Sequence, residues 1–74
     1  MSVYSGTKLY EALKARYEAE IMEAKANLEN YLDNKVGVAE HPNIVESADT
    51  LVEQLATAED RLRTLKQNNK ERYE

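Results

Sequence analysis

The residues that could do chemistry gather around the only histidine, His41, near the middle of this 74-residue chain. A histidine can act as a general base or bind a metal ion, but a base must reach its proton and a metal needs several ligands. The nearby carboxylates belong to Glu40, Glu46 and Asp49. We interpret His41 as a loop residue close to the start of a helix, without a catalytic or metal-binding role.

Other routes to catalysis find no support in the composition or the motifs. The chain has no cysteine, which excludes disulfides, thiolate metal sites and cysteine nucleophiles. It contains no HExxH, GxxxxGK[ST], GxGxxG or GxSxG pattern. Ferritin-like metal sites need inward-facing glutamates and a Glu-x-x-His pair on helices, whereas the only histidine here falls in a predicted loop. We therefore predict that the chain is not an enzyme and uses no metal or cofactor.

Two long stretches of good helix formers are separated by a short break that contains Gly37 and Pro42. They predict a single domain over residues 1–74, with a helix at about 7–34, a loop at about 35–42 and a helix at about 43–71. We expect Thr7 or Ser5 to cap the first helix and Asn43 to cap the second.

Apolar residues recur at steps of three and four in both stretches, which is the spacing of a coiled-coil seam. In the first stretch they are Tyr10, Leu13, Tyr17, Ile21, Ala24, Leu28 and Tyr31. In the second they are Ile44, Ala48, Leu51, Leu55, Ala58, Leu62 and Leu65. One step near Ile21 is out of phase, which would locally rewind the seam. Folding the chain at residue 38 pairs the seams as Tyr31–Ile44, Leu28–Ala48, Ala24–Leu51, Ile21–Leu55, Tyr17–Ala58, Leu13–Leu62 and Tyr10–Leu65. We therefore predict an all-α antiparallel two-helix hairpin with a coiled-coil-like seam.

The first helix carries a second stripe, almost opposite the seam. We call it the alanine stripe; its members are Ala12, Ala15, Ala19, Met22 and Ala26. One interpretation is an exposed face whose alanines simply favour helix. The other is a self-association surface, which Val45, Val52 and Ala56 of the second helix could join. Because two helices alone bury little, we predict a homodimer that forms a four-helix bundle.

Charge is uneven along the predicted hairpin. The net charge of −4 argues against bulk attraction to nucleic acid or anionic lipid. The open half (residues 1–19 and 58–74) holds eight basic and six acidic residues, and the loop half (residues 20–57) holds two basic and eight acidic ones. This asymmetry could serve solubility and the helix dipoles alone. Alternatively, phosphate or an acidic partner could contact Lys14, Arg16, Arg61, Arg63, Lys66 and Lys70.

The predicted loop offers a further contact surface at Val38, Glu40 and His41. Val36 and Val38 are unexpectedly apolar for a solvated loop. Either they fold back and plug the end of the bundle, or they form an exposed docking site for a partner. No apolar run approaches the roughly 18 residues of a membrane span, and the first residues have no apolar signal core. We expect a cytoplasmic protein without membrane contact.

Three parts of the sequence carry a resemblance to a known family: Glu23–Ala26, the loop Val36–Pro42 and Ala58–Asp60. In these residues the chain resembles the small helix-loop-helix accessory proteins of T4-like phages and cyanophages, such as the one encoded next to the phage recombination helicase. The resemblance covers about two-thirds of the chain. It implies a phage-encoded hairpin of uneven charge that assists DNA recombination or its helicase in the host cytoplasm, and it implies no catalytic residues.

These observations favour a small non-enzymatic interaction or adaptor protein that binds a protein partner and a second copy of itself. The alternative is an accessory factor in DNA recombination or replication that contacts nucleic acid through its basic open end.

Overall fold

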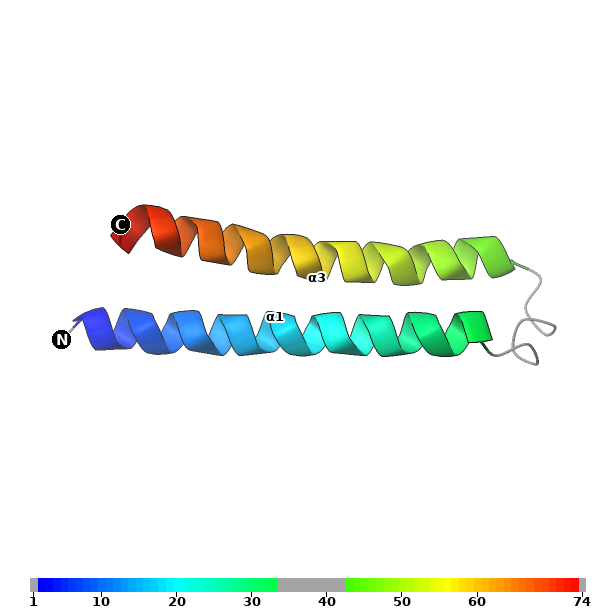
Figure 1. Ribbon diagram of the computed structural model, residues 1–74, viewed down its shortest axis with the longest axis horizontal. Coiled ribbons are helices and arrows are strands. Elements are labelled where there is room, and N and C mark those ends of the chain that lie inside the picture. Colours follow the sequence, from blue (N-terminus) through cyan, green and yellow to red (C-terminus); the bar gives the residue numbers. More distant parts are fainter. Residues whose placement is uncertain (1, 34–42, 74) are drawn as a thin grey trace.

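The computed structural model describes residues 2–33 and 43–73, which form two long helices. Helix α1 spans Ser2–Asp33 and helix α3 spans Ile44–Tyr73. The helices lie side by side and antiparallel, so that both chain termini are at the same end of the molecule (Figure 1). The principal extents are 56 × 17 × 13 Å. The predicted all-α antiparallel hairpin is therefore confirmed.

The first helix begins earlier than the sequence predicts. It starts at Ser2, five residues before Thr7, and continues through Gly6. Glycine within a helix costs only about 1 kcal/mol relative to alanine, and here the helix pattern on its C-terminal side continues for more than six turns. The prediction that Thr7 or Ser5 caps the helix is wrong, because both lie inside it.

The second helix begins where the sequence predicts. The backbone N–H of Ser47 donates to the carbonyl oxygen of Asn43 at 3.0 Å, which makes Asn43 the N-cap residue. Glu46 lies in the first turn, and Lys70 and Arg72 lie in the last turn. These charges suit the partial positive and negative ends of the helix dipole, and α3 continues to Tyr73, slightly beyond the predicted end.

The predicted seam forms the contact between the two helices. All fourteen seam residues of the two stretches are buried or half-buried. Within the described ranges only Ala24 and Ala58 are buried apolar residues, at 4% and 3% exposure. The hairpin therefore has a narrow line of contact instead of a closed core.

The register agrees with the predicted pairing at Tyr31 and Ile44 and departs from it in the middle of the hairpin. The Tyr31 hydroxyl donates to the carbonyl oxygen of Ile44 at 3.4 Å, as the Tyr31–Ile44 pair predicts. Farther along, Ile21 shares a surface groove with Leu62, and Tyr17 shares one with Leu65. In each case the groove neighbour lies seven residues, or two seam positions, beyond the predicted partner, so the pairs Ile21–Leu55 and Tyr17–Ala58 are not confirmed. A fold at residue 38 predicts pairs whose residue numbers sum to about 76, whereas these neighbours sum to 83 and 82, so the two helices are shifted along each other relative to the predicted pairing.

The predicted loop, 35–42, lies outside the described residues. So do the predicted loop contacts at Val38, Glu40 and His41, and the two alternatives for Val36 and Val38.

Candidate interaction surfaces

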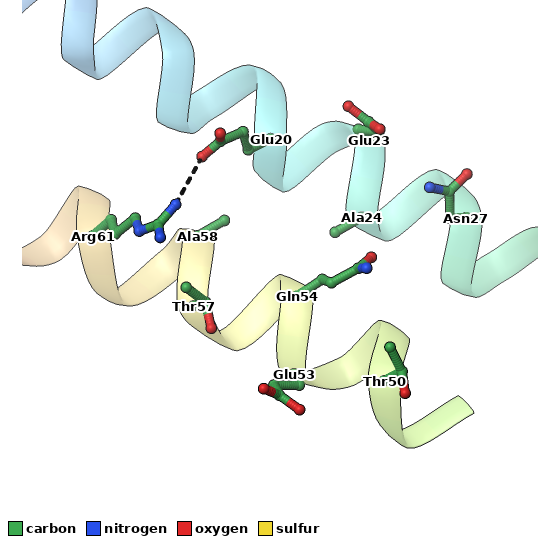
Figure 2. A pocket seen from close by; sticks show the side chains of 10 residues that line it. All are labelled: Glu20, Glu23, Ala24, Asn27, Thr50, Glu53, Gln54, Thr57, Ala58 and Arg61. Carbon is green, nitrogen blue, oxygen red and sulfur yellow. Dashed lines mark ion pairs between the residues drawn. The ribbon is translucent and has the colours of Figure 1, made fainter. Parts of the chain in front are cut away.

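A polar groove runs along one side of the seam, centred on the two buried alanines. It encloses about 470 Å³ and is open to solvent. Its lining residues are Glu20, Glu23, Ala24, Asn27, Thr50, Glu53, Gln54, Thr57, Ala58 and Arg61. Figure 2 shows Ala24 and Ala58 each pointing toward the opposite helix. Because their methyl groups fill little space, the longer polar side chains beside them form the walls of the groove.

An ion pair bridges the two helices at this groove. Arg61 Nη1 lies 3.8 Å from Glu20 Oε1, as the dashed line in Figure 2 marks. Glu20 also pairs along its own helix with Arg16, at 3.5 Å between Oε2 and Nε. Its Oε1 atom is buried and accepts no hydrogen bond from the residues that the structure describes. Glu20 is therefore a charged residue at the edge of the seam, held by one arginine from each helix.

This groove was not among the predicted surfaces, although the sequence contains a signal for it. Glu20 and Asn27 follow Leu13 at steps of seven residues, so a regular heptad would place apolar residues there. Instead, the apolar seam moves to Ile21 and Leu28, which is the out-of-phase step. The irregularity marks the point at which polar residues take over one edge of the helix contact.

The groove on the other side of the seam has larger apolar side chains in its lining. A second open groove there is lined by Ile21, Lys25, Glu59, Leu62, Arg63, Lys66 and Gln67. Ile21 and Leu62 thus lie on the side of the hairpin opposite Glu20 and Arg61. Residues that lie seven positions from these groove residues, toward the loop half, fall on nearly the same face of each helix. They extend the same surface. We call it the apolar side and define it by Ile21, Leu28, Leu32, Val45, Ala48, Val52, Leu55 and Leu62.

The alanine stripe lies on a third surface. All five members are exposed, and Met22 is 72% exposed. By helical spacing the stripe occupies the face of α1 that turns away from α3. Val45 and Val52, which the sequence placed with the stripe, belong to the apolar side, so the two sets form separate surfaces.

The predicted basic contact residues lie in the open half, on both helices and on both sides of the seam. Lys14 is half-buried, and the other five are exposed. Three of them form ion pairs: Arg16 and Arg61 with Glu20, and Arg63 with Asp60. No ion pair involving Lys14, Lys66 or Lys70 occurs among residues 2–33 and 43–73. Of the six predicted basic contact residues, these three lysines are the ones whose ammonium groups could pair with an anionic group of a partner.

The described surfaces offer no assembled metal centre. In residues 2–33 and 43–73, no group of three or more histidine, cysteine, aspartate or glutamate side chains is placed to hold a metal ion. Within the same ranges, neither helix contains an apolar stretch that is long enough to cross a membrane.

The architecture is that of a small antiparallel helical hairpin. Comparison with protein-family models, with curated proteins and with solved structures found no match to this chain. The resemblance to phage accessory proteins therefore remains a prediction from the residues that carry it.

Proposed function

We propose that this chain is a non-enzymatic interaction protein, an adaptor that binds a protein partner through an exposed helical surface. The observation that supports this proposal most directly is that more large apolar side chains are exposed than apolar residues are buried. Only Ala24 and Ala58 are buried apolar residues in the described ranges, whereas five large apolar side chains are exposed: Leu9, Met22, Leu32, Val45 and Val52. Soluble proteins that stay monomeric and unbound rarely leave contiguous apolar surface uncovered.

Self-association into a four-helix bundle is part of the proposal. A 74-residue chain with so few buried side chains gains little stability from its own seam. A second copy would cover apolar surface on both chains at once. The alanine stripe and the apolar side are two surfaces for such contacts, and the stripe stays a predicted surface for a second chain.

Affinity capture from the cells in which the chain occurs tests the adaptor function. The wild-type hairpin should recover one specific protein. Ala19→Glu should lower that recovery if the alanine stripe contacts the partner, because it places a charge in the middle of the stripe. Thr64→Glu is the matched control, since Thr64 is an exposed residue of α3 away from the stripe. Capture of no specific protein by the wild-type chain would contradict the adaptor function.

The second candidate is an accessory factor that contacts nucleic acid in DNA recombination or replication. It is favoured by Lys14, Lys66 and Lys70, which make no ion pair in the described part of the chain. The resemblance to phage accessory proteins supports the same role and a location in the host cytoplasm. A contact through so few cations would be weak and would decrease steeply with salt.

Titration with labelled single- and double-stranded DNA at low salt tests this second candidate. Lys66→Gln should weaken any binding, whereas Asn30→Glu makes the same one-unit change of charge at an exposed position of the acidic loop half and should have a smaller effect. No binding by the wild-type protein at low salt would end the nucleic-acid hypothesis.

A further inference from the structure

The two grooves that flank the middle of the seam carry opposite charge. The polar groove holds three carboxylates and one cation, from Glu20, Glu23, Glu53 and Arg61. The groove on the other side, which we call the basic groove, holds three cations and one carboxylate. Its charged residues are Lys25, Glu59, Arg63 and Lys66. An anionic group is therefore attracted to one side of the hairpin and repelled by the other.

Two of the three cations of the basic groove are available to a partner. Lys25 and Lys66 are exposed, and neither forms an ion pair among residues 2–33 and 43–73. Arg63 pairs with Asp60 on its own helix. The two lysines come from different helices, so a partner that contacts both must lie along the groove between α1 and α3.

The apolar part of the basic groove lies between these lysines. Ile21 and Leu62, one from each helix, line the groove and are half-buried seam residues. An amphipathic helix can lay its apolar face into such a groove, and charged residues beside an apolar seam pair with the opposite charge on the facing helix. This combination fits a helix that carries carboxylates beside an apolar stripe.

A nucleic-acid backbone fits the same groove less well. A chain of phosphates has no apolar surface with which to cover Ile21 and Leu62. The net charge of −4 on the whole chain also repels a long polyanion, whereas a short acidic helix contacts only the basic groove.

From these observations we propose that the basic groove binds an acidic amphipathic helix of a partner protein. Apolar side chains of that helix lie over Ile21 and Leu62, and its carboxylates pair with Lys25 and Lys66. The inference rests on the proposed adaptor function and names the chemistry of the segment that the adaptor binds.

A designed peptide tests this groove without the natural partner. The probe is a helix of about 21 residues, or about three heptads, with leucine at positions a and d and glutamate at e and g. Its counterpart carries lysine at e and g. The wild-type hairpin should bind the glutamate peptide at least about tenfold more tightly than the lysine peptide, measured by fluorescence anisotropy at low salt. No binding of the glutamate peptide, or equal binding of both, would overturn the inference.

Charge reversal in the groove should weaken this binding. Lys25→Glu and Lys66→Glu should each raise the dissociation constant about three- to thirty-fold, because each removes an attraction and adds a repulsion. Lys8→Glu is the matched control, since Lys8 is exposed and lies four residues before Ala12, on the face of the alanine stripe. It should change the constant less than about twofold. An equal effect of all three substitutions would show a response to net charge alone and overturn the inference.

Two exposed glutamines, one in each groove, locate the bound peptide. Gln67 lines the basic groove and Gln54 lines the polar groove. The chain has no cysteine, so Gln67→Cys and Gln54→Cys each take one environment-sensitive fluorophore. The glutamate peptide should change the emission of the label at position 67 and not that at position 54. The reverse would overturn the inference. So would a response of the label at position 67 to dilution without peptide, which would show that a second copy fills the groove.

The outcomes for the groove and for the adaptor function are separate. Affinity capture that recovers no protein ends the adaptor function, whatever the peptide does. Recovery of a specific protein by a hairpin that does not bind the glutamate peptide overturns the groove inference alone. Binding of labelled DNA that Lys25→Glu and Lys66→Glu weaken, without binding of the peptide, would assign the groove to nucleic acid instead.

Discussion

Ala24 and Ala58 lie on opposite helices, line the same polar groove and are the most fully buried apolar residues of the described chain. Each points toward the facing helix (Figure 2). All other seam residues remain half-exposed along at least one edge. The pair therefore marks the tightest point of a fold that otherwise has little interior.

The first prediction concerns this point of contact. Ala24→Asp should destabilise the hairpin by about 3 kcal/mol or more, because it buries a carboxylate next to Glu20 and Glu23. Ala26→Asp makes the same chemical change at an exposed position two residues away and should cost about 1 kcal/mol or less, most of it from the lower helix propensity of aspartate. Thermal and urea unfolding followed by circular dichroism measures both. Equal effects of the two substitutions would show that Ala24 is not at the helix contact.

A second prediction tests the seam at a larger residue. Leu55 is half-buried, so Leu55→Ala should cost about 1–3 kcal/mol, at or below the lower part of the range for fully buried leucines. Leu9→Ala is the control, because Leu9 is 63% exposed. Urea unfolding at a fixed protein concentration gives both free energies. A Leu55→Ala variant as stable as the wild type would refute the assignment of Leu55 to the seam.

The bridge between Glu20 and Arg61 should contribute little to stability. Their side chains are 33% and 55% exposed, and ion pairs of this kind are worth about 0–1 kcal/mol. A double-mutant cycle with Glu20→Gln and Arg61→Gln should give a coupling free energy within that range, decreasing as salt is added. A coupling of about 2 kcal/mol or more that persists in high salt would show that the pair is far better shielded than its exposure indicates.

The alanine stripe gives a fourth prediction, which tests whether it is a self-association surface. Ala19→Glu places a charge in the middle of the stripe, so it should dissociate a dimer that the stripe holds together and leave the helix content unchanged. Light scattering measures the molar mass, and circular dichroism measures the helix content. A dimer that persists in Ala19→Glu would show that the stripe is not the self-association surface, and a reduced capture of a protein partner would then assign the stripe to that partner.

Much of the fold could be predicted from the sequence because the seam is periodic over both helices. The steps of three and four residues identify the facing sides, and Asn43 marks the start of α3. The start of α1 could not be predicted in the same way. Glycine at position 6 weakens a helix only slightly, so its presence does not fix a boundary.

The candidate surfaces were harder to predict. Glu20 and Ile21 are neighbours in the sequence, but the sequence does not show that they lie on opposite sides of the helix contact. That division depends on how the two helices are rotated toward each other, which determines that Glu20 faces Arg61 and Ile21 faces Leu62. The alanine stripe was visible in the sequence because it lies on one helix alone. The apolar side was not, because it is made by residues of both.

Self-association of the hairpin is tested most directly by the molar mass of the wild-type protein in solution, determined by light scattering at low and at moderate salt. A chain that covers exposed apolar surface with a second copy should give about 17 kDa, twice the 8.5 kDa of the single chain. The dimer should persist at moderate salt, because apolar contacts hold it together and salt screens only interactions between charges. A mass of 8.5 kDa under both conditions would contradict the account.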